Sequence, residues 1–232
     1  MKKPLYRLAL FDLDHTLLPL DSDHGWGEFT MQIGWCDRAE FGRRNDAFFE
    51  DYLAGRLDIH DYVRFATEAV VQRGPQAAAA AHQRFMDEII RPAIRPAAIE
   101  LVRRHQQAGD VVVITSATNE FVTRPIAQAF GVDELIATEL ARGPDGWLTG
   151  EVAGQPNMRE GKVARMDAWL AARGLDADAV QRYRLGFNPG ERGRNCIIRP
   201  RESWGLPPVL KDNGKPKKLW LPRGIELLVP SP

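Results

Sequence analysis

The middle of the chain alternates short apolar runs with amphipathic stretches, and this alternation constrains the fold more than any other feature. The run VVVIT at 111–115 is β-branched, as in strands that are buried on both faces of a parallel sheet. An amphipathic helix pattern precedes this run and ends at Gly109, and a second helix pattern follows the run. A short strand at 135–140, a polar hairpin connection and a helix from about 160 to 173 continue the series. This order predicts an α/β fold with a Rossmann-like open parallel sheet.

A block of helical patterns separates this region from an apolar strand at residues 6–11. The segment DIHDYVRFATEAVVQR has apolar residues at three- and four-residue spacing, with Asp58 in position to cap a helix. A further helix is expected to restart after Gly74-Pro75. We therefore expect a helical cap inserted after the first strand. The predicted division is an α/β core at 1–16 and 92–181, a cap at 17–91, and a basic, proline-rich tail at 182–232.

Composition excludes several classes of protein. The chain has 232 residues, of which 44% are hydrophobic, and no apolar run approaches the roughly 20 residues of a membrane span. The N-terminal segment lacks a signal-peptide pattern, and two cysteines form no disulfide framework, so a cytoplasmic protein is expected. The net charge of +0 gives no reason to expect a nucleic-acid partner. No membrane partner is expected, and the oligomeric state is not indicated.

Polar side chains follow two of the predicted strands. Asp12 and Asp14 come directly after the first apolar run, and Ser116 and Thr118 come after VVVI. Lys162 lies in the first turn of the helix that begins near residue 160. Because ligands of open α/β sheets bind beyond the carboxyl ends of the strands, all five side chains are expected at one edge. Two carboxylates this close repel each other unless a cation or a proton is present.

These residues resemble the haloacid dehalogenase (HAD) superfamily of phosphatases and phosphotransferases. The hydrophobic strand and D-x-D-x-T of its first motif correspond to FDLDHT, the second motif to VVVITSAT, and the third to Lys162 in REGKVARM. The resemblance covers roughly residues 6–181. The position of the helical insertion is similar to that of the phosphoserine-phosphatase-like branch, subfamily IB.

The resemblance implies a role for each motif residue. Asp12 would attack phosphorus and form an aspartyl-phosphate, and Asp14 would be the general acid and then the general base. Ser116 would donate to a phosphoryl oxygen, and Lys162 would neutralise charge on the phosphate and on Asp12. A Mg²⁺ cofactor would be held by Asp12 and by the backbone carbonyl of Asp14.

Two further residues are expected to contact the substrate. Thr118 is the last residue of the VVVITSAT segment, and Asp21 lies nine residues after Asp12. In phosphoserine phosphatases a carboxylate at the position of Asp21 binds the substrate amine, so the resemblance allows an amine-bearing substrate. The expected partner is thus a small phosphorylated metabolite, with phosphoserine and histidinol phosphate as candidates.

Simpler interpretations of the same residues remain open. The two aspartates could only terminate a strand, Ser116 or Thr118 could only cap the following helix, and Lys162 could be a solvated lysine. The histidines at 24, 60, 82 and 105 show no metal-ligand spacing and are expected on the surface or on helix faces.

The fourth HAD motif is missing. The family places one or two aspartates after the next strand, here RYRLGF at 182–187, but no aspartate occurs between Asp178 and Asp212. Asn188 and Glu191 lie near the expected place without forming the motif. From residue 182 the chain holds 11 Lys and Arg against 4 Asp and Glu, and 8 of the 16 prolines. A change of reading frame is our favoured explanation; a divergent basic extension and a partly disordered tail are the alternatives.

The sequence therefore predicts a Mg²⁺-dependent phosphatase that hydrolyses a small phosphomonoester through an aspartyl-phosphate. The alternative is a catalytically impaired HAD-like protein that binds phosphorylated ligands or a partner without turnover, which the missing fourth motif favours. A nucleic-acid-binding role for the basic tail lacks a recognition motif.

Overall fold

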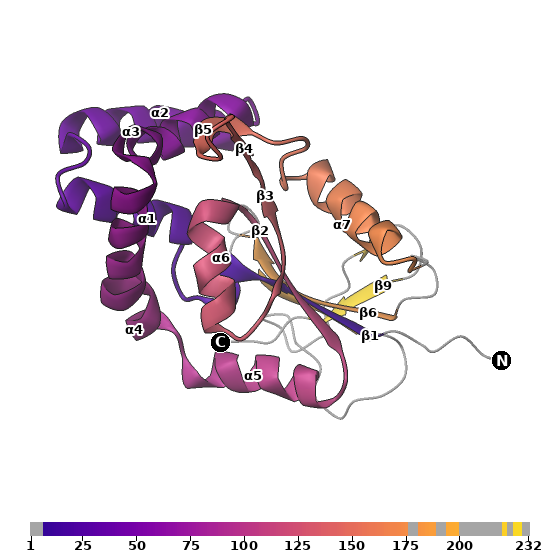
Figure 1. Cartoon of the computed structure of the whole chain (residues 1–232). Coiled ribbons are helices and arrows are strands. Elements are labelled where there is room, and N and C mark those ends of the chain that lie inside the picture. The colour runs from indigo at the N-terminus through magenta and orange to yellow at the C-terminus, as the bar shows by residue number, and fades with distance from the viewer. Residues whose placement is uncertain (1–6, 176–180, 189–193, 200–219, 222–224, 229–232) are drawn as a thin grey trace.

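A seven-stranded sheet crosses the molecule (Figure 1). The computed structural model describes residues 7–175 and the backbone of strands at 181–188, 194–199, 220–221 and 225–228. The first four strands in the order below are parallel and the other three extend the sheet antiparallel, which confirms the expected α/β fold. The order is β3 (Glu134–Thr138), β2 (Val111–Asn119), β1 (Arg7–Asp12), β6 (Gln181–Asn188), β7 (Arg194–Arg199), β9 (Ile225–Leu228) and β8 (Trp220–Leu221).

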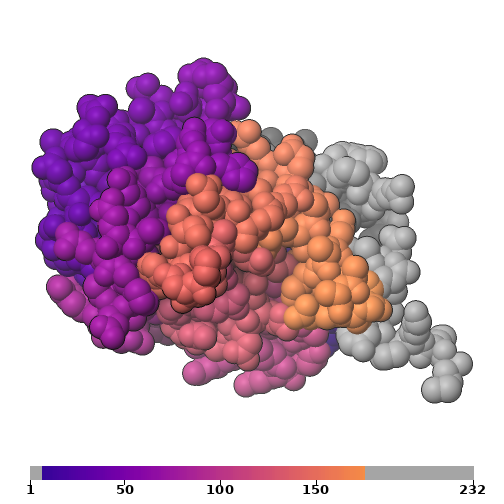
Figure 2. Space-filling view, turned by 45° about the horizontal axis from the view of Figure 1, so that its top comes forward, coloured from indigo at the N-terminus to yellow at the C-terminus, as the bar shows by residue number. Residues whose placement is uncertain are grey.

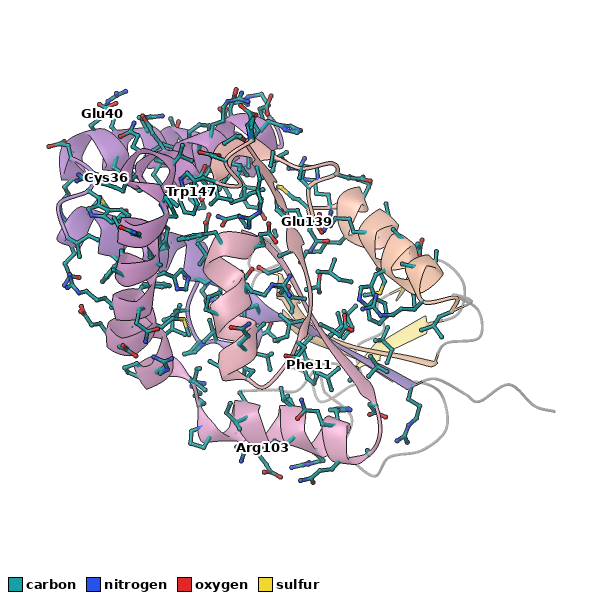
Figure 3. The ribbon with its side chains drawn as sticks, viewed as in Figure 1. Phe11, Cys36, Glu40, Arg103, Glu139 and Trp147 are labelled. Atoms are coloured by element: carbon teal, nitrogen blue, oxygen red, sulfur yellow. The ribbon has the colours of Figure 1, made fainter. Side chains whose placement is uncertain are left out.

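Hydrophobic side chains bury the strands on both faces of the sheet. The helices nearest the sheet are α5 (Pro96–Gln107), α6 (Glu120–Ala129) and α7 (Glu160–Ala172). Ala9 and Phe11 of β1 are fully buried in the larger core, to which α5 and α6 contribute. Leu8 lies in a second cluster with Met166 of α7. Figure 3 shows Phe11 within the molecule and Arg103 on the outer side of α5. The alternation in β1 is that of a parallel strand covered on both faces.

A helical cap stands between β1 and α5 in the sequence, and its residues gather on one side of the molecule (Figure 2). Its helices each begin after an aspartate, namely Asp21, Asp37 and Asp58, whose carboxylate accepts hydrogen bonds from backbone amides of the first turn. The third helix kinks at Gly74, where φ is +77°, as expected from the Gly-Pro step. The helices are α1 (Ser22–Gln32), α2 (Arg38–Leu53) and α3 (Ile59–Phe85), and η2 (Met86–Ile90) and α4 (Arg91–Ala93) lead to α5.

A small hairpin of β4 (Leu140–Arg142) and β5 (Leu148–Val152) follows β3, as the polar turn predicts. It packs against α3 of the cap. The indole of Trp147, labelled in Figure 3, donates from Nε1 to the carbonyl of Val71 at 3.3 Å. The hairpin falls within the range predicted as core, 92–181, but it contacts the cap.

Two local expectations were wrong. The strand expected at 111–115 runs on to Asn119, so Ser116 and Thr118 lie within β2 and not after it. Asn119, rather than either hydroxyl residue, caps α6 by accepting from the amide of Val122 at 3.2 Å. The hydroxyl side chains are therefore not used for capping.

His82, expected on the surface or on a helix face, lies on a face of α3 that is buried, and it is only 5% exposed. It lies on α3 beside α6, and its Nε2 is 3.2 Å from the carbonyl oxygen of Val122. Its ring stacks on Trp26 of α1. The imidazole is thus part of the packing between cap and core.

The strand expected at 182–187 is present as β6 and runs parallel to β1. Glu191 lies outside the described residues, as does most of the sequence from 200 onward, so the three explanations of the tail stay untested. Among the described residues, no helix combines the length and the apolar character needed to cross a membrane.

Candidate active site

Asp12 is the last residue of β1 and lies at the carboxyl end of the parallel strands. Nζ of Lys162 is 3.0 Å from Oδ1 of Asp12, and the hydroxyl of Thr16 donates to Oδ2 at 3.5 Å. The Asp12 side chain is only 13% exposed and the Lys162 side chain 26%. The first and third sequence motifs therefore meet in a largely shielded ion pair.

The chain turns sharply after Asp12, in the short segment η1 (Leu13–Leu17). His15 takes a left-handed conformation with φ of +55°, and its amide donates to the carbonyl of Leu20 at 3.2 Å. The strand does not continue as far as Asp14, which has extended backbone angles within this turn. The turn directs the Asp14 carboxylate toward β2 and α1.

Three donors hold the Asp14 carboxylate. The amide of Ser22 donates to Oδ1 at 2.7 Å, and the hydroxyls of Ser116 and Thr118 donate to Oδ2 at 2.9 and 3.2 Å. Burial, and then the charge of Asp21, raise the pKa of Asp14 to about 6, although its hydrogen bonds partly oppose both effects. A carboxyl group with this pKa exists in both protonation states near neutral pH, which suits a general acid and base.

Ser116 and Thr118 lie where β2 departs from regular pairing with β3. Thr115 pairs with Ile136, but the next pair is Asn119 with Thr138, so four steps along β2 match two along β3. Such a bulge redirects side chains and interrupts the ladder of backbone hydrogen bonds. Here both hydroxyls point to one oxygen of Asp14.

Asn157, which sequence reasoning missed, lies next to this bulge and is fully buried. Its Nδ2 donates to the carbonyls of Ser116 and Ile136 at 2.7 and 2.8 Å and to the hydroxyl of Thr115 at 2.9 Å. It belongs to the loop between β5 and α7. The only sequence signal is its position five residues before Lys162, which is weak because asparagine is common in loops.

Asp21 lies near these residues, but its carboxylate serves α1. Its Oδ1 accepts from the amides of Asp23 and His24 at 3.0 and 2.9 Å. Asp23 instead accepts a hydrogen bond from the hydroxyl of Tyr62 on α3. Burial, and then the charge of Asp21, raise the pKa of Asp23 to about 7. Asp23, two residues after the predicted Asp21, is therefore the carboxylate that contacts α3 of the cap.

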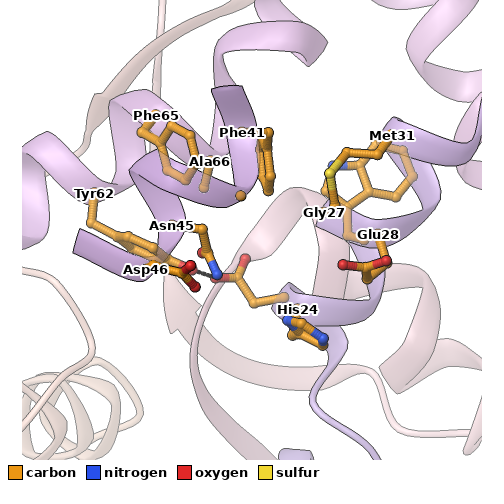
Figure 4. Close-up of a pocket in the computed structure, with 13 residues that line it drawn as sticks. His24, Gly27, Glu28, Met31, Phe41, Asn45, Asp46, Tyr62, Phe65 and Ala66 are labelled. Carbon is orange, nitrogen blue, oxygen red and sulfur yellow. Dashed lines mark hydrogen bonds between the residues drawn. The ribbon is translucent and has the colours of Figure 1, made fainter. Parts of the chain in front are cut away.

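A cavity of about 120 Å³ lies inside the cap next to Asp23 (Figure 4). Asp23 and Tyr62 line it together with aromatic residues and the acidic side chains of Glu28 and Asp46. A second cavity of about 160 Å³ opens on α1, α2 and α3 near Trp35. Neither includes a motif residue; the first is linked to the motifs through Ser22, which precedes Asp23 and contacts Asp14.

Part of this site suits Mg²⁺, which takes oxygen ligands and often only one or two carboxylates. Asp12 fits, since Thr16 is the one described donor to its Oδ2, at 3.5 Å. Both carboxylate oxygens of Asp14 already accept hydrogen bonds, which leaves its backbone carbonyl as the possible ligand. Within the described ranges no group of three acidic, histidine or cysteine side chains is arranged for a metal ion.

The structure thus brings Asp12, Asp14, Ser116, Thr118 and Lys162 together as expected. Asp21 is close enough for its charge to affect Asp14, but its carboxylate is engaged with backbone amides. None of these contacts tests a catalytic, substrate-binding or metal-binding role, so those roles are still predictions.

Comparison with known proteins agrees with the sequence motifs. Residues 9–183 match the family described as haloacid dehalogenase-like hydrolase. A histidinol-phosphatase of Neisseria meningitidis serogroup C (strain 8013) is 41% identical over 176 residues, which span 76% of this chain and 78% of that protein.

Solved structures show the same fold. A protein of unknown function from Bordetella pertussis Tohama I has 46% sequence identity and a TM-score of 0.71, covering 77% of this chain and 80% of that one. A phosphoserine phosphatase, solved as an analogue of its phospho-aspartyl intermediate, has 19% identity and a TM-score of 0.52, with 78% of each chain covered. The second similarity is one of fold alone.

Proposed function

The chain belongs to the haloacid dehalogenase-like hydrolase family, and we propose that it is a phosphatase in which Asp12 attacks a small phosphomonoester. The observation that carries the proposal is the 3.0 Å contact between Lys162 and Asp12, whose positions are far apart in the sequence. A carboxylate is ionised at neutral pH and needs no separate base to act as a nucleophile. Attack would form an aspartyl-phosphate on Asp12 and release the alcohol.

Lys162 would stabilise negative charge as the phosphoryl group transfers. Its ammonium already lies against Asp12, so a phosphoryl group bound there would also be within its reach. Charge compensation and positioning account for most of phosphoryl-transfer catalysis. Ser116 and Thr118 would bind phosphoryl oxygens, which requires them to exchange the Asp14 oxygen for the substrate.

Asp14 would donate a proton to the departing alkoxide and later accept one from the attacking water. Its pKa of about 6 supports both steps near neutral pH. Loss of the hydrogen bonds from Ser116 and Thr118 upon substrate binding would favour the protonated acid, because those bonds stabilise the carboxylate. Substrate binding would thus prepare the general acid.

Mg²⁺ is the proposed cofactor. Asp12 and the backbone carbonyl of Asp14 would hold it, and when bound it would offset the negative charge of the phosphate. Because the described residues supply a single carboxylate, that of Asp12, which Lys162 also contacts, we expect weak metal affinity.

The proposed substrate class is a phosphomonoester with a cationic leaving group, such as histidinol phosphate. The similarity to the Neisseria histidinol-phosphatase supports this class. So does the local charge: Asp14, Asp21 and Asp23 are neighbours, and no described lysine or arginine forms an ion pair with any of them. An ammonium or imidazolium group would relieve the repulsion among these carboxylates.

A catalytically impaired relative is the second candidate, favoured by the absence of fourth-motif aspartates after β6. Phosphate release from p-nitrophenyl phosphate and histidinol phosphate, with and without Mg²⁺, distinguishes the two. We expect Mg²⁺-dependent turnover by the native protein and no turnover by Asp12→Asn. The control variant Asp37→Asn, changed at a cap residue away from the motifs, should keep native turnover. A folded native protein without turnover on either substrate would favour the impaired relative.

A further inference from the structure

We propose that Asn157 is a positioning residue that ties the phosphoryl-binding end of β2 to the loop that leads to Lys162 at the start of α7. The inference rests on the proposed phosphatase function but concerns a residue outside the sequence motifs. It starts from the bulge in β2, where Ser116 and its neighbours leave the regular ladder with β3.

The bulge deprives buried backbone carbonyls of their ladder partners. Buried carbonyls without donors are rare in folded proteins because their desolvation is costly. Nδ2 of Asn157 supplies a donor to Ser116 at 2.7 Å and to Ile136 at 2.8 Å. One amide group therefore bridges the ends of β2 and β3 at the residue that contacts Asp14.

A second set of bonds completes the bridge. The backbone amide of Asn157 donates to the hydroxyl of Thr138 at 3.1 Å, and that hydroxyl donates to the carbonyl of Ala117 at 2.7 Å. Asn157 and Thr138 are both fully buried. The conformation that presents Ser116 and Thr118 to the site thus depends on two side chains that never touch Asp14 themselves.

The same loop is tightly joined to the start of α7. A Cβ atom placed on Gly161 would lie 2.0 Å from the carbonyl oxygen of Pro156. The residue before Asn157 therefore packs directly against the residue before Lys162. Arg159, between them, has φ of +51°, an unfavourable conformation for a residue with a side chain. Movement of Asn157 would consequently shift both Ser116 and Lys162.

The arrangement explains why the residue is an asparagine. All three acceptors around Nδ2 are oxygens, so the position needs a donor with little bulk. Aspartate has the same shape but would place an oxygen against two carbonyls. The Asn157→Asp variant therefore reverses the hydrogen-bonding character without changing size.

The test compares Asn157→Asp and Thr138→Val with Thr138→Ser, which keeps the hydroxyl, and with Thr67→Val. Thr67 is a matched control: it is 1% exposed and bonds only within α3, to the carbonyl of Val63 at 2.7 Å. Turnover of p-nitrophenyl phosphate and calorimetric binding of inorganic phosphate are measured where circular dichroism shows each variant folded.

We expect Asn157→Asp and Thr138→Val to lower kcat and phosphate affinity together, by roughly 10- to 100-fold, since displacements of about 1 Å can cost 100-fold. Thr138→Ser should restore most of the loss. Adding Asn157→Asp to Ser116→Ala should cost less than in the native chain, because part of its effect passes through the Ser116 hydroxyl.

Folded Asn157→Asp and Thr138→Val proteins with native kcat and native phosphate affinity would overturn the proposal. If Asn157→Asp does not fold, the smaller Thr138→Val change decides the result. A native protein without turnover would count against the proposed function, and the phosphate-binding comparison would still decide the role of Asn157.

Discussion

The imidazole of His82 stacks on the indole of Trp26, with ring centroids 5.4 Å apart and an interplanar angle of 28°. His82 comes from α3 and Trp26 from α1, and Phe121 of α6 packs edge-on against both rings, at 5.2 and 5.5 Å. The contact joins two cap helices to the core. Because it contains a titratable ring, it makes the stability of this junction dependent on pH.

We predict that His82 makes the protein less stable below pH 6.5. Burial lowers the pKa of His82 in the folded chain, so the unfolded chain takes up the proton first. Stability from this residue is therefore complete above about pH 6.5, the ordinary histidine pKa, and is lost as the pH falls toward the lower folded value. Urea unfolding of native protein and His82→Phe between pH 5 and 8 measures the effect, since phenylalanine keeps an aromatic ring.

The difference in unfolding free energy between the two proteins should shift in favour of His82→Phe at pH 5 relative to pH 8. The comparison cancels Asp14 and Asp23, whose raised pKa values act in the opposite direction. A difference independent of pH would mean that His82 can be protonated without disturbing its contacts.

We predict that Asp14→Asn slows the hydrolysis of phosphomonoesters with poor leaving groups more than of those with good leaving groups. General acid catalysis contributes roughly 100- to 10,000-fold when an alkoxide must be protonated, but much less for p-nitrophenolate. Turnover of an alkyl phosphate and of p-nitrophenyl phosphate by native and variant protein gives the two ratios. For the native protein, kcat/KM for the alkyl phosphate should decline above about pH 6, as Asp14 of the free enzyme loses its proton. Equal losses on both substrates would argue against the general acid role.

Asp23→Asn is predicted to reduce selectivity for a cationic leaving group. Asp23 borders the cap cavity and accepts from Tyr62, whereas Asp21 is engaged with the start of α1. Asparagine can still accept that hydrogen bond but removes the negative charge. We expect kcat/KM for histidinol phosphate to fall about tenfold, equivalent to about 1.4 kcal/mol, with little change for p-nitrophenyl phosphate, whose leaving group carries no positive charge. Equal changes on both substrates would argue against a contact between Asp23 and the cationic leaving group.

Much of the fold and of the site could be predicted because local patterns determine them. The apolar runs specified β1 and β2, and parallel strands necessarily bring their carboxyl ends, with Asp12 and Ser116, to one edge. Asp58 was identified as a helix cap because capping depends on nearby backbone amides. Predictions of this kind need no knowledge of distant contacts.

The parts that were missed depend on distant contacts. Asn157 matters only because β2 bulges beside β3, and the bulge is visible in the strand register but not in the run VVVITSAT. His82 is buried because its face of α3 meets α6, which helical periodicity alone cannot reveal. Sequence alone does not distinguish Asp21 from Asp23, because both lie in a segment with the composition of an ordinary loop. They differ in the direction of their carboxylates, which accept hydrogen bonds from backbone amides of α1 and from Tyr62, respectively.

Gly161→Ala is predicted to cause a large loss of activity and stability, although it adds one methyl group. Its Cβ would lie 2.0 Å from the Pro156 carbonyl oxygen, a backbone atom that cannot move without shifting the loop before Lys162. Gly42→Ala in α2 is the matched control, because nothing lies within 4 Å of its added Cβ and alanine favours helices by about 1 kcal/mol. Thermal unfolding and p-nitrophenyl phosphate turnover should show Gly161→Ala destabilised by about 1–3 kcal/mol, as for overpacked sites, and at least tenfold slower. Gly42→Ala should be equally active and slightly more stable. Native activity in Gly161→Ala would show that this loop can adjust without moving Lys162 away from Asp12.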